Sequence, residues 1–301
     1  MAADAVGGGA GLSGDVRAAR APAALWLTAL AMLCFAANSL LCRAALAEPR
    51  IDPASFTAVR LASGAVFLGA LTWARRGREV LRAGRWSSAL ALFAYAAAFS
   101  FAYVGLTAGA GALILFGAVQ ATMIGVGWAR GEGLSWPQRL GAGLAAAGLV
   151  YLLLPGATAP PLLDAMLMGC AGIAWGVYSL IGRQASASGR DPTLETAGNF
   201  LRSVPLCLAL APFAASAHLT PAGAALAVAS GALASGAGYA VWYAALKGLN
   251  ASEAAIVQLT VPAIAAAGGV ALLHEPLSPR LLIAAAAILG GVAVVLSARR
   301  A

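Results

Sequence analysis

Residues Ile283–Leu296 read IAAAAILGGVAVVL, a stretch without a single polar side chain. A helix built from this stretch is apolar on every face, so no side of it suits water. A strand of a transmembrane β-barrel would instead alternate apolar and polar positions over about ten residues. The stretch therefore predicts a helix that lies among other apolar helices or in lipid.

Composition extends this interpretation to the whole chain. Of the 301 residues, 61% are hydrophobic and 10% are charged, whereas soluble domains are about half apolar and a quarter charged. A helix needs roughly 20 apolar residues to cross a hydrocarbon core of about 30 Å, so the chain has room for ten spans. The predicted fold is an all-α integral membrane protein with ten transmembrane helices at residues 24–46, 54–73, 86–105, 108–129, 137–154, 162–183, 192–215, 222–246, 251–273 and 277–297.

The first 20 residues differ from the rest, because they are rich in Gly, Ala and Ser. Such a composition predicts a disordered tail, here on the cytoplasmic side. Arg17, Arg20 and the apolar run from Ala23 imitate a cleavable signal peptide, but the run exceeds the 7–15 apolar residues typical of such signals. It also has a counterpart later in the chain. We therefore expect the run to be retained as the first span.

Lys and Arg gather at alternate ends of the predicted spans, and cytoplasmic loops are the ones enriched in these residues. With a cytoplasmic N-terminus, 14 of the 19 basic residues fall on the cytoplasmic side: Arg17, Arg20, Arg75, Arg76, Arg78, Arg82, Arg85, Arg130, Arg139, Arg183, Arg190, Lys247, Arg299 and Arg300. Both termini are therefore expected in the cytoplasm. Anionic lipid attracts this face, so the net charge of +8 does not require a nucleic-acid partner.

The two halves of the chain match at an offset of about 140 residues, which indicates an internal repeat. The matching pairs are SLLCR at Ser39–Arg43 with SLIGR at Ser179–Arg183, Asp52-Pro53 with Asp191-Pro192, and EGLS at Glu132–Ser135 with EPLS at Glu275–Ser278. The predicted repeats are residues 24–154 and 162–298, with five helices each. An odd number of helices inverts the second copy, as in many secondary transporters, and the substrate site is then expected between the halves.

These features resemble the drug/metabolite transporter superfamily, EamA type. The resemblance is carried by the five-plus-five helices, the Asp-Pro helix starts, Gly131–Ser135 and the His274-Glu275-Pro276-Leu277 element, and it covers essentially the whole chain beyond the tail. It implies a multi-pass carrier of the bacterial inner membrane that exports amino acids, other metabolites or toxic compounds, with no prosthetic group.

One position departs from the pattern of this family, which often has proline in the fourth helix of both repeats. Gln120 aligns with Pro262. Since proline is a common cause of sharp helix kinks, we expect a kink in the ninth predicted helix and none in the fourth.

Polar and aromatic side chains deep in the spans are the candidate substrate-binding residues. A charged side chain costs about 2.5–3.5 kcal/mol at the centre of a membrane helix and so tends to face an interior. Arg202 lies roughly 15 Å beyond Pro192 at 1.5 Å per residue, and it is favoured to face the substrate or an internal partner such as Glu195. Arg60 lies about 10 Å into its span by the same rule. A second interpretation for this residue is that its long side chain snorkels to the outer interface.

The full predicted set is Asn38, Arg60, Tyr95, Phe99, Gln120, Trp175, Tyr178, Arg202, Tyr239, Trp242 and Gln258. Amides and aromatic rings also serve as interhelical hydrogen-bonding and packing groups, and both interpretations stay open for them.

Enzymatic and metal chemistry lack the residues they need. The cysteines Cys34, Cys42, Cys170 and Cys207 form no CxxC or Cys/His cluster. The only histidines, His218 and His274, lie near predicted loops, and the sequence contains neither GxSxG nor HExxH. We therefore expect no enzyme, metal or cofactor. No carboxylate lies at the centre of a span, so proton antiport, exchange and facilitated diffusion all stay open.

The predicted function is secondary transport by alternating access, with export of a small organic metabolite such as an amino acid or related compound. The alternatives are a carrier for drugs or toxic compounds and a non-transporting polytopic receptor or assembly subunit. The expected partners are a small-molecule substrate and the lipid bilayer, without nucleic acid; a homodimer stays open.

Overall fold

The computed structural model describes residues 9–131, 133–214, 218–249 and 251–298. Within these residues the fold is helical, and the extended pairing is one isolated bridge between Ile51 and Leu219. The elements in chain order are α1 (Gly9–Leu46), α2 (Pro53–Arg76), α3 (Glu79–Arg82), α4 (Trp86–Ala102), α5 (Ala108–Ala129), α6 (Trp136–Leu153), α7 (Leu162–Ala187), α8 (Pro192–Ser203), the 3₁₀ segment η1 (Pro205–Ala214), α9 (Pro221–Val228), the π-helical segment η2 (Ala229–Ala237), α10 (Gly238–Leu246), α11 (Ala251–Gln258), α12 (Thr260–Leu273) and α13 (Pro279–Ser297).

Seven helical segments of the described residues are long and apolar enough to cross a membrane. They are Ala24–Leu46, Pro53–Arg76, Ala108–Ala129, Leu162–Ala187, Pro221–Leu246, Glu253–Leu273 and Pro279–Ser297. The three other predicted spans correspond to α4, which is a shorter apolar helix, to α6, and to α8 with η1. A multi-pass helical membrane protein is thus confirmed, while the count of ten stays a prediction.

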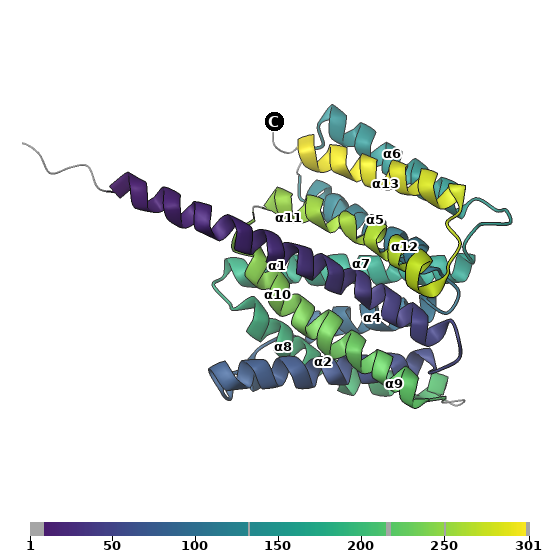
Figure 1. Ribbon diagram of the computed structural model, residues 1–301, viewed down its shortest axis with the longest axis horizontal. Coiled ribbons are helices and arrows are strands. Elements are labelled where there is room, and N and C mark those ends of the chain that lie inside the picture. The colour runs from purple at the N-terminus through teal and green to yellow at the C-terminus, as the bar shows by residue number, and fades with distance from the viewer. Residues whose placement is uncertain (1–8, 132, 215–217, 250, 299–301) are drawn as a thin grey trace, which may run out of the picture.

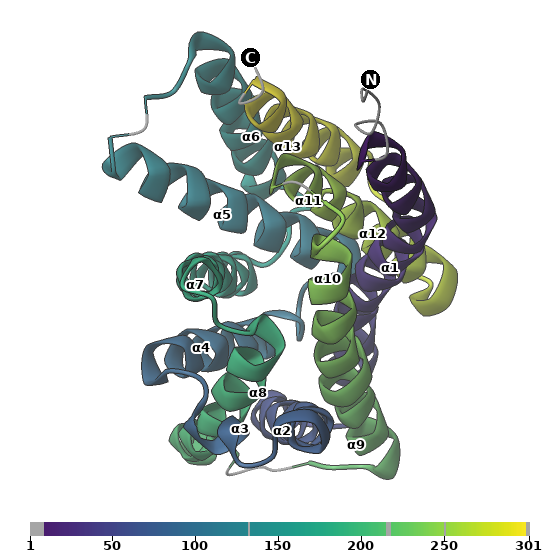
Figure 2. The ribbon, with the colours of Figure 1, turned by 90° about the vertical axis from the view of Figure 1, so that its left-hand side faces the viewer.

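The N-terminal helix is longer than its predicted span. α1 begins at Gly9 and so overlaps residues 9–20 of the predicted tail; residues 1–8 lie outside the described part, and disorder of the tail stays a prediction. Figures 1 and 2 show that α1 begins and α13 ends on the same side of the bundle.

The Asp-Pro pairs act as helix starts, as the sequence predicts. Asp52 accepts a hydrogen bond from the Ser55 N–H at 2.8 Å, and Asp191 accepts one from Thr193 N–H at 2.9 Å. Each caps amide groups that the first helical turn leaves unpaired, and proline occupies the following position, where it needs no N–H partner. Partial burial raises the pKa of Asp52, but hydrogen bonds from Ser55 and His218 outweigh it, so the pKa lies below its usual value.

The ninth predicted span is interrupted, and the fourth is not. α11 ends at Gln258 and α12 begins at Thr260, whereas α5 runs unbroken through Gln120. Pro262 explains the break, since it has no N–H to donate and its ring conflicts with the carbonyl four residues earlier, that of Gln258. The two helices therefore differ at the place where the sequence predicts a difference, and the kink itself stays a prediction.

Helices from the two halves of the chain pack crosswise. α1 packs on α10 and α12, and correspondingly α7 packs on α4 and α5 (Figure 2). α2 lies against α8, and α6 lies beside α13 at one edge of the bundle (Figure 1). Each contact therefore recurs when the halves exchange roles, which is the pattern that a pseudo-two-fold axis between them generates.

The α6–α13 contact depends on two glycines that face each other. A Cβ atom at Gly141 would collide with the carbonyl oxygen of Gly291, and one at Gly291 would collide with the backbone of Gly141. Small residues of this kind let membrane helices approach closely, where van der Waals packing is the main attraction.

We predict that Gly141→Ala lowers the thermal unfolding temperature of the purified protein, because the added methyl forces the two backbones apart at a cost of about 1–3 kcal/mol. Gly143→Ala in the same helix is the matched control, since a Cβ there meets no atom within 4 Å. It should be neutral or stabilising. Equal unfolding temperatures for the two variants would contradict the close approach.

Candidate functional site

A cavity of about 870 Å³ enters the bundle from the end where α2, α7 and α10 finish. Its rim carries seven charged side chains, which are Arg75, Arg76, Arg85, Arg183, Lys247, Asp191 and Glu195. All but Glu195 are exposed, so the cavity is open here. We call this end of the molecule the basic end, and this cavity the wide cavity.

Deeper inside, the lining changes from charged to aromatic and amide groups. The wide cavity reaches Gln120, Trp175, Tyr178, Tyr239, Trp242 and Gln258. A second cavity of about 30 Å³, here called the inner cavity, shares Phe35, Trp175, Tyr239 and Gln258 with it and is further lined by Asn38, Tyr95, Phe99 and Ser235. The two cavities thus lie side by side and share these four wall residues.

The structure brings most of the predicted site residues together. Nine of the eleven line one or both cavities, the exceptions being Arg60 and Arg202. The nine come from α1, α4, α5, α7, α10 and α11. This set of helices belongs to both halves of the chain, as expected for a site between repeats. Contact of these residues with a substrate stays a prediction.

Trp175 of α7 is the centre of an aromatic cluster that separates the two cavities. Its ring stacks on Tyr178 at 5.2 Å and on Tyr239 at 5.4 Å between centroids, with interplanar angles of 26° and 19°. Tyr95 approaches the same ring at 4.9 Å, and Tyr239 also contacts Phe35 at 5.8 Å. Rings held on several sides keep a fixed orientation, so they present a rigid wall to a solute.

Arg60 points into the protein, which decides between its two predicted positions. The residue is 2% exposed, and its guanidinium lies over the rings of Tyr95 and Phe99 at 5.1 and 4.9 Å. Nη2 donates a hydrogen bond to the Tyr95 hydroxyl at 3.1 Å. Arg60 therefore does not snorkel to an interface, and it lies directly behind the wall of the inner cavity.

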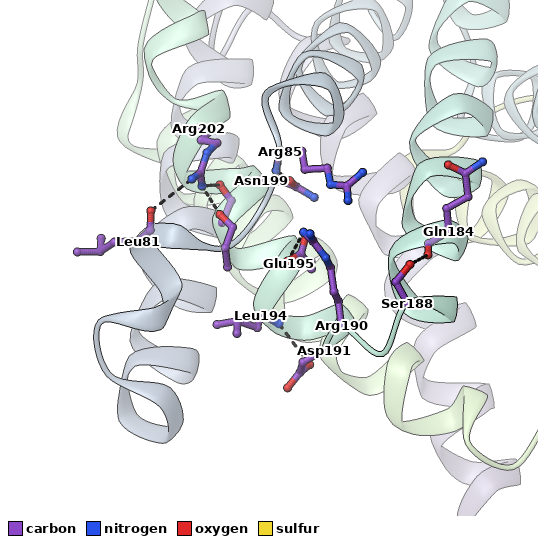
Figure 3. A network of polar contacts seen from close by, with 12 residues as sticks. Leu81, Arg85, Gln184, Ser188, Arg190, Asp191, Leu194, Glu195, Asn199 and Arg202 are labelled. Atoms are coloured by element: carbon purple, nitrogen blue, oxygen red, sulfur yellow. Dashed lines mark hydrogen bonds and ion pairs between the residues drawn. The ribbon is translucent and has the colours of Figure 1, made fainter.

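Arg202 has a different environment from the one predicted. Its guanidinium donates to the backbone carbonyls of Leu81, Ala83 and Gly198 and ties α8 to the connection before α4 (Figure 3). Glu195, its expected partner, instead pairs with Arg190 at 3.4 Å. The partner prediction is wrong because the 79–85 segment folds inward against α8, where its carbonyls reach Arg202 first. Nearby, Asn199 accepts from the Arg85 N–H at 2.9 Å.

At the opposite end of the bundle, a second arginine joins several segments. At the basic end, Ala24 of α1 lies beside Gly248. From there α1 runs to the far end, where it carries Arg43. Arg43 Nε donates to Glu275 Oε1 at 3.0 Å, and its Nη1 donates to the carbonyls of Tyr103 and Val104 at 3.1 and 2.8 Å. We call this the closed end.

Glu275 completes the connection. Its Oε2 accepts the Ala108 N–H at 2.8 Å, at the start of α5. His274 makes this position possible, because its left-handed conformation, with φ at 53°, ends α12 and turns the chain back. One ion pair thereby joins the end of α1, the α4–α5 connection, the start of α5 and the end of α12.

Sequence reasoning missed several of these groups. Arg43 and Glu275 are 232 positions apart, and each stands at a span end where charge is ordinary. Phe35 lies about one helical turn from Asn38 and so lies on the same face of the helix. Helical spacing could therefore have predicted Phe35 as a cavity residue. Ser235 is a small polar residue in an apolar span, and spacing alone gives no such signal for it.

Comparisons with known proteins agree with this architecture. The model of the EamA-like transporter family matches the chain twice, at residues 22–154 and 163–297. The chain belongs to this family of membrane transporters. An uncharacterized protein of Pseudomonas aeruginosa is 55% identical over 276 residues, which are 91% of this chain and 95% of that protein.

A solved crystal structure shares the fold at 22% identity, with a TM-score of 0.66; the match covers 93% of this chain and 99% of the solved one.

We predict that Arg202 has a structural role, as a residue that stabilises the fold, and not a role at the cavity. Arg202→Gln should lower the thermal unfolding temperature, because each hydrogen bond to a charged group is worth about 1.5–3 kcal/mol. Arg190→Gln is the matched control, since that arginine is exposed and exposed ion pairs contribute little. If the two variants unfold at the same temperature, Arg202 has no such structural role.

Proposed function

We propose that this chain is a secondary transporter that moves a small organic metabolite across the bacterial inner membrane by alternating access. The observation that carries the proposal is the asymmetry between the two ends. A wide cavity is open at the basic end, and at the other end the Arg43–Glu275 ion pair joins segments of both halves, so we infer that this end is closed. A carrier needs a central site that is reached from one side at a time, and membership of the EamA-like transporter family supports the same conclusion.

We further propose ten spans with both termini in the cytoplasm. α4, α6 and α8 with η1 would complete the seven clearly apolar segments. An even number of spans agrees with α1 beginning and α13 ending on one side (Figure 1). The basic end would face the cytoplasm, because Lys and Arg are enriched there in membrane proteins. The structure then represents an inward-facing state, ready to load a solute for export.

The internal repeat supplies the second state. Arg43 and Arg183 end matching motifs in the two halves, yet Arg43 lies in the closed end while Arg183 lines the open rim. Related halves in unlike environments are what an inverted-repeat carrier has in each of its two states, since the halves exchange conformations between them. The outward-facing state would open the end at Arg43 and close the end at Arg183.

Cavity size and lining favour a small organic solute. Ligand sites usually occupy about 300–1,000 Å³ with mostly apolar walls and a few polar groups, and the wide cavity has about 870 Å³ with aromatic walls and the amides of Gln120 and Gln258. An amino acid or related compound suits this combination. The aromatic stack at Trp175 favours, as a second candidate, efflux of a larger drug-like or toxic compound.

The direct test is transport by the purified protein in liposomes, with labelled amino acids, nucleosides and cationic drugs as solutes. We expect at least one solute to cross faster than in empty vesicles. Gln258→Ala should reduce that rate, because this residue lines both cavities. No movement of any solute, with the protein correctly inserted, would favour the alternative of a non-transporting receptor or assembly subunit.

Opening of the closed end has its own test, which needs no known substrate. Cys42 is fully buried beside Arg43. In a variant with Cys34, Cys170 and Cys207 replaced by alanine, Glu275→Gln should raise labelling of Cys42 by a membrane-impermeant maleimide added from outside, because the neutral amide holds Arg43 less tightly.

The control for this labelling experiment is Glu48→Gln. Glu48 pairs with Arg50 just beyond the same end of α1, but its side chain is 72% exposed and the pair joins neighbouring residues. The substitution should leave Cys42 unlabelled. Equal labelling in the two variants would show that the Arg43–Glu275 pair does not hold this end shut.

A further inference from the structure

Arg60 is a buried cation without a matching anion. The ion pairs of the described residues involve Arg43, Arg50, Arg76 and Arg190, and none reaches Arg60. Its Nη1 atom is buried and has no hydrogen-bond partner. Burying a charge is costly unless a counter-charge and hydrogen bonds compensate it, and this is most severe within a membrane. Tyr95 and the two ring faces compensate part of this cost, and no described anion compensates the rest.

The hydrogen bonds around Arg60 leave a donor at the inner cavity. The Tyr95 hydroxyl accepts from Arg60 Nη2 at 3.1 Å and from Asn38 Nδ2 at 3.2 Å. Both acceptor positions of this oxygen are then used, while its own hydrogen is left to donate. Asn38 is oriented by Ser230, whose hydroxyl donates to Asn38 Oδ1 at 2.7 Å. The chain of donors from Ser230 through Asn38 therefore ends at Tyr95, which lines the inner cavity.

Ser235 adds a second group to the same cavity. Its Oγ atom is buried without a partner, and the residue lines the inner cavity from η2. η2 can lie this close to α2 because Gly231 faces the Arg60 carbonyl, where a Cβ atom would collide. Of the described residues, Arg60 and Ser235 are the two whose buried side-chain atoms lack partners. Ser235 lines the inner cavity, and Arg60 lies behind Tyr95 and Phe99 in the wall of the same cavity.

We infer that the inner cavity receives the carboxylate group of the transported solute, and this inference rests on the proposed function. The space of about 30 Å³ is two to three times the roughly 10–15 Å³ that one water needs, which suits the three heavy atoms of a carboxylate. The hydrogen-bonding groups that line it include the Tyr95 and Ser235 hydroxyls and the Gln258 amide, with no carboxylate among them, and the Arg60 guanidinium lies behind this wall, over the rings of Tyr95 and Phe99. A carboxylate supplies the missing charge and accepts these hydrogen bonds.

The remainder of the solute would lie in the wide cavity against Trp175 and Tyr239, which line both spaces. A solute that carries only an amine would meet the guanidinium with like charge and leave the donors unpaired. The substrate class is therefore an organic acid or amino acid with an apolar or aromatic body.

The test is binding to the purified protein by four probes that share a phenyl ring and a three-carbon chain: 3-phenylpropanoate, phenylalanine, 3-phenylpropanol and 3-phenylpropylamine. We expect the two carboxylates to raise the thermal unfolding temperature in a saturable way, and the alcohol and amine to have little effect. Tyr95→Phe should raise the Kd of the carboxylates about tenfold, since a hydrogen bond to a charged group is lost.

Ser235→Ala should weaken carboxylate binding in the same direction, whereas Ser100→Ala should not change it. Ser100 is an equally buried serine whose hydroxyl donates within its own helix to the Ala96 carbonyl, so it controls for loss of a buried hydroxyl. Equal weakening in both serine variants would overturn the assignment of Ser235.

Arg60→Met separates a binding role from a structural one. Removing an uncompensated buried charge should leave the ligand-free unfolding temperature unchanged or raise it, and should abolish the response to carboxylates. A large fall in the ligand-free value would instead show that Arg60 holds the fold together.

Three outcomes overturn the inference: equal binding of all four probes, preference for the amine, or the same Arg60-dependent stabilisation by chloride alone, which would make this an inorganic anion site. None of these bears on whether the protein transports a solute. Conversely, carboxylate binding without transport of any solute in liposomes would leave the site intact and contradict the proposed function.

Discussion

A bilayer offers no water to polar groups, and this constraint shapes the whole molecule. Backbone N–H and C=O groups at membrane depth must find partners within the protein, so regular helices dominate and irregular backbone is confined to places that are buried or line a cavity. The two interruptions near the site follow this rule. η2 carries Ser235 on the wall of the inner cavity, and the break between α11 and α12 falls beside Gln258 on the wall of both cavities.

The same constraint explains how charge is used. At the basic end, charged side chains surround the open rim of the wide cavity, and most of them are exposed. At the closed end, Arg43 is compensated by Glu275 and two carbonyls. Between these ends lies Arg60, which is paired with a hydroxyl and two ring faces but with no anion. If a solute carboxylate compensates the charge of Arg60, binding of the solute also removes the cost of burying that charge. The solute-bound state is then favoured over the empty one.

Much of this organisation could be predicted from the sequence, because hydropathy, proline and capping act locally. The Asp-Pro helix starts depend on a few neighbouring residues and are confirmed. The interruption before Pro262 is equally local, and it falls in the helix for which a kink is predicted. The polar and aromatic candidates mostly line the cavities because a costly group in a span is driven to the interior wherever that interior lies. The partner prediction for Arg202 was wrong, because it considered only the depth of the residue along α8. It did not consider the neighbouring segment, which folds back to meet the side chain. The Arg43–Glu275 pair could not be predicted from the sequence for a different reason. Only the three-dimensional packing brings these two distant segments together.

The central claim is that one cavity is reached alternately from the two sides of the membrane. Its most direct test is the accessibility of a cysteine at Gln258, introduced into a variant without the four native cysteines and reconstituted in vesicles of known orientation. Impermeant maleimide should label it readily from the side of the basic end and slowly from the opposite side, and a solute that binds should change the balance between the two rates. Labelling from the basic end alone under every condition, or equally fast labelling from both sides, would contradict alternating access.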